Sequence, residues 1–173
     1  MPTRTSAGPP APTPPGTDAS PTEVVRWVFD IVNTHRSAPL RDVLTADVRL
    51  RLPDATYRGV DAVLGFWEGL FAAVPDLTVT MQAVAEQDGT VFVRWTLTGT
   101  HSGAEWAGIG PTGAHLDLDG IDHVTVSGGR IHADFVVFDQ LQVARQLGLA
   151  PAEGSRLDVA LRRGRGILAR LRH

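Results

Sequence analysis

The stretch LDLDGIDHVTVSGGRIHADFVVF, residues 116–138, decides the fold, because it predicts a long β-hairpin around a glycine-rich turn. Apolar residues share one parity along its first strand, and that face is expected to be buried: Leu116, Leu118, Val124 and Val126. Asp122 has the same parity. Burying a carboxylate among apolar residues costs free energy, so its presence there indicates a function. Asp122 is therefore a candidate site residue.

The turn decides which residue Asp122 faces. A three-residue loop over 127–129 would pair Val126 with Arg130 and set Asp122 directly opposite Asp134, with their Cβ atoms roughly 5 Å apart. A two-residue Gly-Gly turn would instead place the two carboxylates on opposite faces, because a slip of one residue reverses every side chain. We favour the longer loop.

Composition excludes several classes of protein. The chain of 173 residues is long enough for one domain with a real core, and its net charge of −3 does not favour nucleic-acid binding. No apolar run approaches the roughly 20 residues of a membrane span. Cysteine and lysine are absent, which excludes thiol nucleophiles, thiolate metal sites and Schiff-base chemistry on this chain. No metal-binding spacing occurs either, so no metal is expected.

The order of predicted elements indicates an α+β domain with a curved antiparallel sheet wrapped around N-terminal helices. A capping box at Ser20 predicts the first helix, which should span 21–34. A short helix over 39–44, a strand over 47–52 and a helix over 60–74 should follow. Strands over 77–86 and 90–101 precede the hairpin, and a short helix capped by Asp139 should end at Leu147. Such a cone leaves a pocket between helices and sheet.

The two ends of the chain differ from this domain, which we place at residues 20–150. Residues 1–19 are rich in proline and lack the apolar core of a secretory signal, so we expect a disordered arm and a cytoplasmic protein. Residues 151–173 predict a basic amphipathic helix. We expect it to pack on its own domain or on a dimer partner; contact with an anionic membrane is the alternative.

Several motifs together resemble the SnoaL-like polyketide cyclases of the nuclear-transport-factor-2-like superfamily. The resemblance covers roughly residues 22–150, and its pieces are weak singly but specific in combination. They are VVRWVFDIVN (24–33), AAVPDL (72–77), VRWTLTGTHSG (93–103), GIGPTG (108–113), GGRI (128–131), FD (138–139) and RQLG (145–148).

The resemblance implies a cone-shaped α+β barrel that is usually dimeric, contains a cavity and needs no cofactor. It also implies an aspartate as general acid/base three positions before the aspartate of the FD motif, but that position is Val136 here. The positions of Asp122 and Asp134 are similar to places where the cyclases hold polar groups, usually histidines. Asp122 also matches the IDH motif of the related steroid isomerases, whose aspartate donates to an oxyanion.

Asp122 and Asp134 are therefore the predicted catalytic pair. If both are buried, one pKa must rise, which supplies a proton donor and an acceptor near neutral pH. We predict Asp134 as the base and protonated Asp122 as the group that holds the developing enolate oxygen. We expect His123 and His132 to face solvent or a dimer partner. The predicted substrate pocket contains Trp27, Asn33, Tyr57, Trp67, Trp95, His101, Trp106, Val136 and Phe138.

Two functions remain open at this level. The favoured one is a cofactor-independent cyclase or isomerase of secondary metabolism, which acts on a hydrophobic, polyketide-like or aromatic carbonyl compound by enolisation or aldol chemistry. The alternative is a non-catalytic binding or interaction module of the same fold, and valine at position 136 is its best support.

Overall fold

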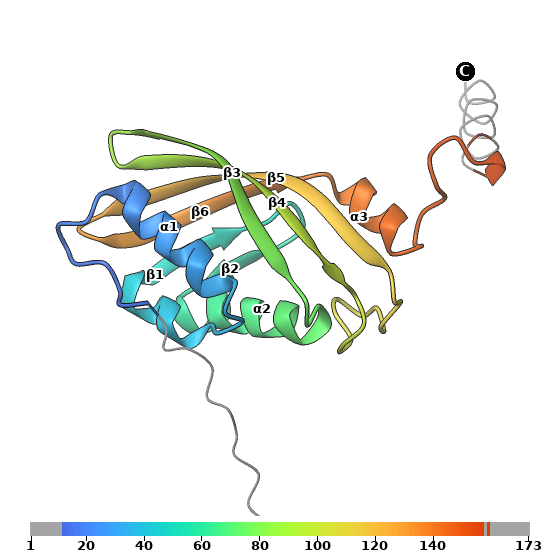
Figure 1. Cartoon of the computed structure of the whole chain (residues 1–173), viewed down its shortest axis with the longest axis horizontal. Coiled ribbons are helices and arrows are strands. Elements are labelled where there is room, and N and C mark those ends of the chain that lie inside the picture. Colours follow the sequence, from blue (N-terminus) through green and yellow to red (C-terminus); the bar gives the residue numbers. More distant parts are fainter. Residues whose placement is uncertain (1–11, 158, 160–173) are drawn as a thin grey trace, which may run out of the picture.

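The computed structural model describes residues 12–157 and 159, and its main element is one curved six-stranded sheet (Figure 1). The strand order is β2-β1-β6-β5-β4-β3, so the last four strands form an antiparallel meander. The sheet curves around the helices without closing, and the predicted α+β cone is confirmed. The strands are β1 (Leu44–Arg51), β2 (Thr56–Arg58), β3 (Thr78–Gln87), β4 (Thr90–Thr100), β5 (His115–Ser127) and β6 (Arg130–Phe138).

Helix α1 (Pro21–Val32) begins at the predicted capping box. The Ser20 hydroxyl accepts a hydrogen bond from the Glu23 N–H at 3.3 Å, and the Glu23 carboxylate accepts one from the Ser20 N–H at 2.7 Å. The helix packs against β3, β4 and β5 through its apolar stripe. It ends at Val32 rather than at the predicted Thr34.

The remaining helices cover the other end of the sheet. Helix α2 (Val60–Ala73) packs on β1 and β2, and it follows a short 3-10 helix, η1 (Ala38–Val43). Helix α3 (Gln140–Gln146) contacts β5 and is capped by Asp139, as predicted. The Asp139 carboxylate accepts hydrogen bonds from the N–H groups of Leu141 and Gln142. The interior between α1, α2 and the concave face of the sheet is therefore lined by buried apolar side chains.

The β5–β6 turn differs from the prediction. Ser127 pairs with Arg130 across a two-residue Gly128-Gly129 turn in which both glycines have positive φ, so the expected three-residue loop is wrong. Val126 then pairs with Ile131 but Thr125 pairs with Ala133, so His132 is an extra residue that forms a bulge. The bulge reverses the parity of β6.

The bulge returns Asp134 to the concave face. Asp122 pairs with Val136, and Asp134 pairs with Val124. The predicted direct opposition of the two carboxylates is therefore wrong, because Asp134 lies two residues closer to the turn, on the diagonal. Diagonal neighbours on one face are separated by roughly 7–8 Å, which still allows their charges to interact.

The sequence pattern did not predict two of the strand pairings in the sheet. Strand β1 runs parallel to β6, with Leu50 beside Asp134, although all other neighbours in the sheet are antiparallel. The three-residue strand β2 pairs with β1, and it was not predicted. The β1–β2 connection places residues 52–55 beside the open end of the concave face.

The structure describes only part of the two predicted terminal segments. Within residues 12–19, the Pro12 carbonyl accepts a hydrogen bond from Trp27 Nε1 at 3.0 Å, and Gly16 lies against the β5–β6 turn. The rest of the predicted arm, and residues 158 and 160–173 of the predicted basic helix, lie outside the described residues. Among those that are described, no helix combines the length and the apolar character that a membrane crossing needs.

Candidate active site

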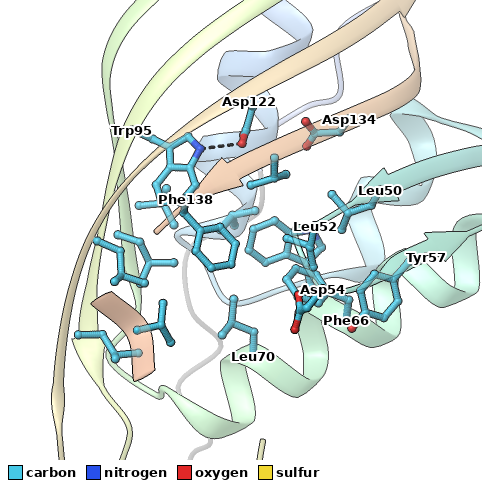
Figure 2. Close-up of a pocket in the computed structure, with 18 of the residues that line it drawn as sticks. Leu50, Leu52, Asp54, Tyr57, Phe66, Leu70, Trp95, Asp122, Asp134 and Phe138 are labelled. Carbon is cyan, nitrogen blue, oxygen red and sulfur yellow. Dashed lines mark hydrogen bonds between the residues drawn. The ribbon is translucent and has the colours of Figure 1, made fainter. Parts of the chain in front are cut away.

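A cavity of about 320 Å³ occupies the space between the helices and the concave face of the sheet. Its wall is mainly apolar, with side chains from α1, α2, α3 and all six strands of the sheet. Figure 2 shows Asp122 and Asp134 at one end of it, with Leu52 and Phe138 between them and the end that holds Asp54 and Tyr57. The predicted pocket residues that line the cavity are Tyr57, Trp67, Trp95, Trp106, Val136 and Phe138.

Asp122 lies on the floor of the cavity with only 9% of its surface exposed. Its Oδ1 atom accepts a hydrogen bond from Trp95 Nε1 at 2.7 Å (Figure 2). Burial raises the pKa of Asp122 to about 7, while the Trp95 hydrogen bond acts in the opposite direction by stabilising the carboxylate. Asp122 is therefore a carboxyl group that can exchange a proton near neutral pH.

Asp134 has no comparable support. Its cross-strand neighbours are Val124 and Leu50, and its buried Oδ1 atom has no hydrogen-bond partner. Burial, and then repulsion by the Asp122 carboxylate, raise the pKa of Asp134 well above its usual range. Both effects favour the protonated form of Asp134.

The hydrogen-bond contacts of the two carboxyl groups differ. An indole N–H can only donate, so Trp95 favours the form of Asp122 that only accepts, the carboxylate. The buried Oδ1 atom of Asp134 has no such donor. The roles of base for Asp134 and acid for Asp122 stay a prediction, and these contacts favour the opposite roles.

Three residues predicted for the pocket lie elsewhere. Trp27 is buried and donates to Pro12, and Asn33 hydrogen bonds to the backbone of Val79. His101 is 1% exposed and sits under the loop over 102–113, where its Nδ1 accepts from the Thr112 N–H at 3.4 Å. None of the three lines the cavity, because each faces a neighbouring segment of the chain.

The two histidines of the hairpin lie on the outer face, His123 through the alternation of β5 and His132 through the bulge in β6. His132 is exposed, and His123 is half-buried and stacks on Phe92 with a centroid separation of 4.8 Å. Neither lines the cavity.

Sequence reasoning missed several lining residues. Asp54 is exposed at the mouth, where it joins Tyr57, Asp122 and Asp134 as a titratable part of the lining. Its position depends on the β1–β2 connection, which could not be recognised without strand β2. Phe29, Phe66 and Gln140 also line the cavity. For Phe29 and Phe66, helical periodicity indicated only the general inner side of each helix.

The loop over 102–113 covers part of the cavity. At its start, the N–H groups of Gly103 and Ala104 donate to the carbonyls of Ala73 and Ala72 at the end of α2. At its end, the Gly113 N–H donates to the His101 carbonyl. Between these anchors, Trp106 and Ile109 form a mutual pair of backbone hydrogen bonds and present their side chains to the cavity.

Within the described residues, no group of three or more histidine, cysteine, aspartate or glutamate side chains is arranged to hold a metal ion. At one end of the cavity, Asp122 and Asp134 form a pair of buried carboxyl groups in an apolar environment. Such a pair can remove a proton from carbon and hydrogen bond to a carbonyl oxygen at the same time.

Comparisons with known proteins agree with this architecture. The chain resembles a proposed SnoaL-like polyketide cyclase from Jannaschia sp. CCS1, with a TM-score of 0.69, 22% identity, and coverage of 76% of this chain and 93% of that one. It also resembles wild-type IdmH, a proposed polyketide cyclase from Streptomyces antibioticus, with a TM-score of 0.64 and 27% identity over 75% of this chain and 99% of the other.

A third similar structure carries a different description. AclR from Streptomyces galilaeus, a proposed hydroxylase, matches with a TM-score of 0.69 and 21% identity over 88% of this chain and 94% of that one. No curated protein matched the chain. The sequence profile described as SnoaL-like polyketide cyclase matches residues 22–147. The chain therefore belongs to the SnoaL-like polyketide cyclase family.

Proposed function

We propose that the protein is a cofactor-independent cyclase that closes a ring in a hydrophobic polyketide-like or aromatic carbonyl compound by aldol chemistry. The observation that carries the proposal is the pair formed by Asp122 and Asp134 on one face of a largely apolar cavity. Membership of the family and the size of the cavity are consistent with a substrate of fused or pre-formed rings.

The position of Asp122, directly opposite Val136, supports the same chemistry. The family resemblance implies an acid/base aspartate at this position of β6, and the valine removes it. Asp122 is the direct cross-strand partner of Val136 and lines the same cavity. A carboxyl group on β5 therefore reaches the region that an acid on β6 would occupy.

The proposed reaction begins with the Asp122 carboxylate, which removes a proton from a carbon next to a carbonyl group. The Asp134 carboxylic acid gives its proton to that carbonyl oxygen, so an enol forms without a free negative charge. The enol carbon then attacks a second carbonyl carbon of the same molecule. The enol O–H proton returns to the Asp134 carboxylate, and the new alkoxide takes the proton held by Asp122. Both groups recover their starting forms.

Substitution of each carboxyl group tests the proposal. With aromatic polyketide substrates supplied as a panel, Asp122→Asn and Asp134→Asn should each lower kcat by about 10²- to 10⁴-fold, because each removes an acid/base group. Asp119→Asn is the matched control, since Asp119 lies on the same strand but is exposed on the opposite face. Undiminished turnover in both cavity variants would refute the assignment.

A non-catalytic binding module is the second candidate, and the specific observation in its favour is Val136. It predicts that a panel compound binds with equal affinity to the wild-type protein and to Asp122→Asn, and that no product forms in either. Calorimetry combined with product analysis by mass spectrometry separates the two functions.

A further inference from the structure

The indole of Trp95 lies against a gap in the neighbouring strand. Trp95 on β4 pairs directly with Gly120 on β5. A Cβ atom at Gly120 would lie 2.1 Å from Trp95 Cζ2, 2.3 Å from Cη2 and 2.6 Å from Cε2. No real side chain fits at these distances, so only glycine lets the ring lie over the β5 backbone in this orientation.

This orientation brings the indole nitrogen to Asp122. The next inward-facing residue of β5 after Gly120 is Asp122, and the Trp95 Nε1 atom reaches its Oδ1 atom at 2.7 Å. A side chain at position 120 would have to displace the ring, and with it the indole nitrogen that contacts Asp122. Gly120 and Trp95 together therefore fix the hydrogen bond between the indole and the Asp122 carboxyl group.

The two carboxyl groups of the cavity are treated unequally. Asp122 accepts a hydrogen bond from an indole N–H, which can only donate, whereas the buried Oδ1 atom of Asp134 has no hydrogen-bond partner. Two nearby buried carboxyl groups in an apolar site cannot both ionise cheaply, so a small asymmetry decides which of them is charged.

We propose that Trp95 and Gly120 are positioning residues that assign the shared proton to Asp134 and leave Asp122 as the base. The inference deepens the proposed function and rests on it for its catalytic meaning. The other titratable residues that line the cavity are Asp54 and Tyr57, which lie toward its far end (Figure 2). No titratable residue of β4 or α1 lines the cavity. Arg94 on β4, for example, is exposed and pairs with Asp119.

The titration of the free protein tests this assignment without any substrate. In carbon-detected NMR spectra the Asp122 side-chain carboxyl should titrate at lower pH than that of Asp134, each assigned by its loss in the Asn variant. The Trp95 indole N–H resonance, identified by its loss in Trp95→Phe, should move with the same midpoint as Asp122. It should not move in Asp122→Asn.

Trp95→Phe keeps an aromatic ring but removes the donor. It should raise the pKa of Asp122 by about one unit or more, the effect of losing a hydrogen bond to a charged group. Trp27→Phe is the matched control, because it removes an indole hydrogen bond to Pro12 outside the cavity. It should leave the Asp122 midpoint unchanged.

Gly120→Ala provides a second, independent variant, because it displaces the ring and keeps the indole nitrogen. It should raise the Asp122 midpoint in the same direction, whereas Gly65→Ala, at a helical position with open space around it, should not. An Asp122 midpoint that stays at its wild-type pH in Trp95→Phe would overturn the inference. So would an Asp134 carboxyl that loses its proton first in the wild-type protein.

The outcome is separable from that of the proposed function. If the midpoints move as expected in a protein that turns over no panel compound, the proton assignment stands and the cyclase proposal fails. With an active substrate, the acidic limb of the kcat/KM profile should move upward in Trp95→Phe with the Asp122 midpoint, which a merely structural role would not produce.

Discussion

A single residue, Asp134, carries most of the electrostatic cost of the site. It lies between the apolar neighbours Val124 and Leu50, and burial raises its pKa well above the usual range. The native protein therefore binds more protons than the unfolded chain above the usual pKa of an aspartate. Stability must then fall as pH rises, from about 4 to about 7 for Asp122 and to higher pH for Asp134.

Asp134→Asn should remove part of this cost. We expect its Tm at pH 8 to exceed that of the wild-type protein by roughly 4–8 °C, equivalent to about 2 kcal/mol. The difference should shrink toward about pH 3, below the usual pKa of an aspartate, where both carboxyl groups are mostly protonated in the native and unfolded states. Calorimetric scans across this range provide the measurement, with Asp119→Asn as the exposed control. A difference in Tm that does not change with pH would contradict the proposed origin.

The inward direction of Asp122 could be predicted at the residue scale, but that of Asp134 could not be derived correctly. Strict alternation in β5 leaves one choice for Asp122. Strand β6 carries apolar residues on both faces, with Phe135 and Val137 exposed outside and Val136 inside, so its pattern does not reveal the bulge at His132. Asp134 nevertheless faces the cavity, as predicted. The shorter turn and the bulge at His132 each reverse the parity of β6, so together they restore it.

At the scale of elements, the side chain of Asn33, the C-cap of α1, joins this helix to the edge strand β3. The Asn33 amide nitrogen donates to the Val79 carbonyl at 2.9 Å, and its oxygen accepts from the Val79 N–H at 2.8 Å. Both bonds satisfy backbone groups on a strand that has only one neighbour in the sheet. Asn33 was predicted to lie in the pocket, but it instead links α1 to β3 outside the cavity.

Asn33→Ala should lower the free energy of unfolding by about 2 kcal/mol, because both groups of Val79 lose their partner. Asn33→Asp should have a smaller effect, since its carboxylate still accepts from the Val79 N–H. Urea denaturation followed by circular dichroism gives both values. Asp30→Ala, at an exposed position of the same helix, is the control. If Asn33→Ala and Asp30→Ala were equally stable, the link would have no energetic role.

Element types were predictable because their signals are local: a capping box, alternation, and turn residues. The bounds moved by a few residues, as at the end of α1. The parallel pairing of β1 with β6 and the short strand β2 depend on contacts between distant parts of the chain. No local pattern encodes such contacts, which explains why Asp54 was missed.

At the scale of the whole molecule, the outer face of the sheet is unusually apolar. Four large side chains on β4, β5 and β6 are 40–50% exposed: Phe92, Ile121, Phe135 and Val137. Opposite charges border them, with Arg94 and Asp119 in a salt bridge of 3.1 Å. A surface that carries both charges beside an apolar centre suits a second copy of itself, so we expect the predicted homodimer to form here.

Phe92→Arg should therefore shift the protein from dimer to monomer in light scattering after size-exclusion chromatography, because it places a charge at the centre of an apolar contact. Glu105→Arg changes an exposed residue of the cavity loop and should leave the molar mass unchanged. A wild-type protein that is monomeric at micromolar concentration would contradict the expectation. The cytoplasmic location and the membrane alternative for the C-terminal helix stay predictions.

The anchoring of the loop over 102–113 has a practical consequence for redesign. Its first residues are fastened to the end of α2 and its last to His101, while Trp106 and Ile109 between them face the cavity. The residues between these anchors can therefore be exchanged while the hydrogen bonds at both ends of the loop are kept. Libraries confined to residues 105–110 can remodel the roof above a bound molecule while the carboxyl pair beneath stays in place, which separates the choice of what is bound from the chemistry done on it.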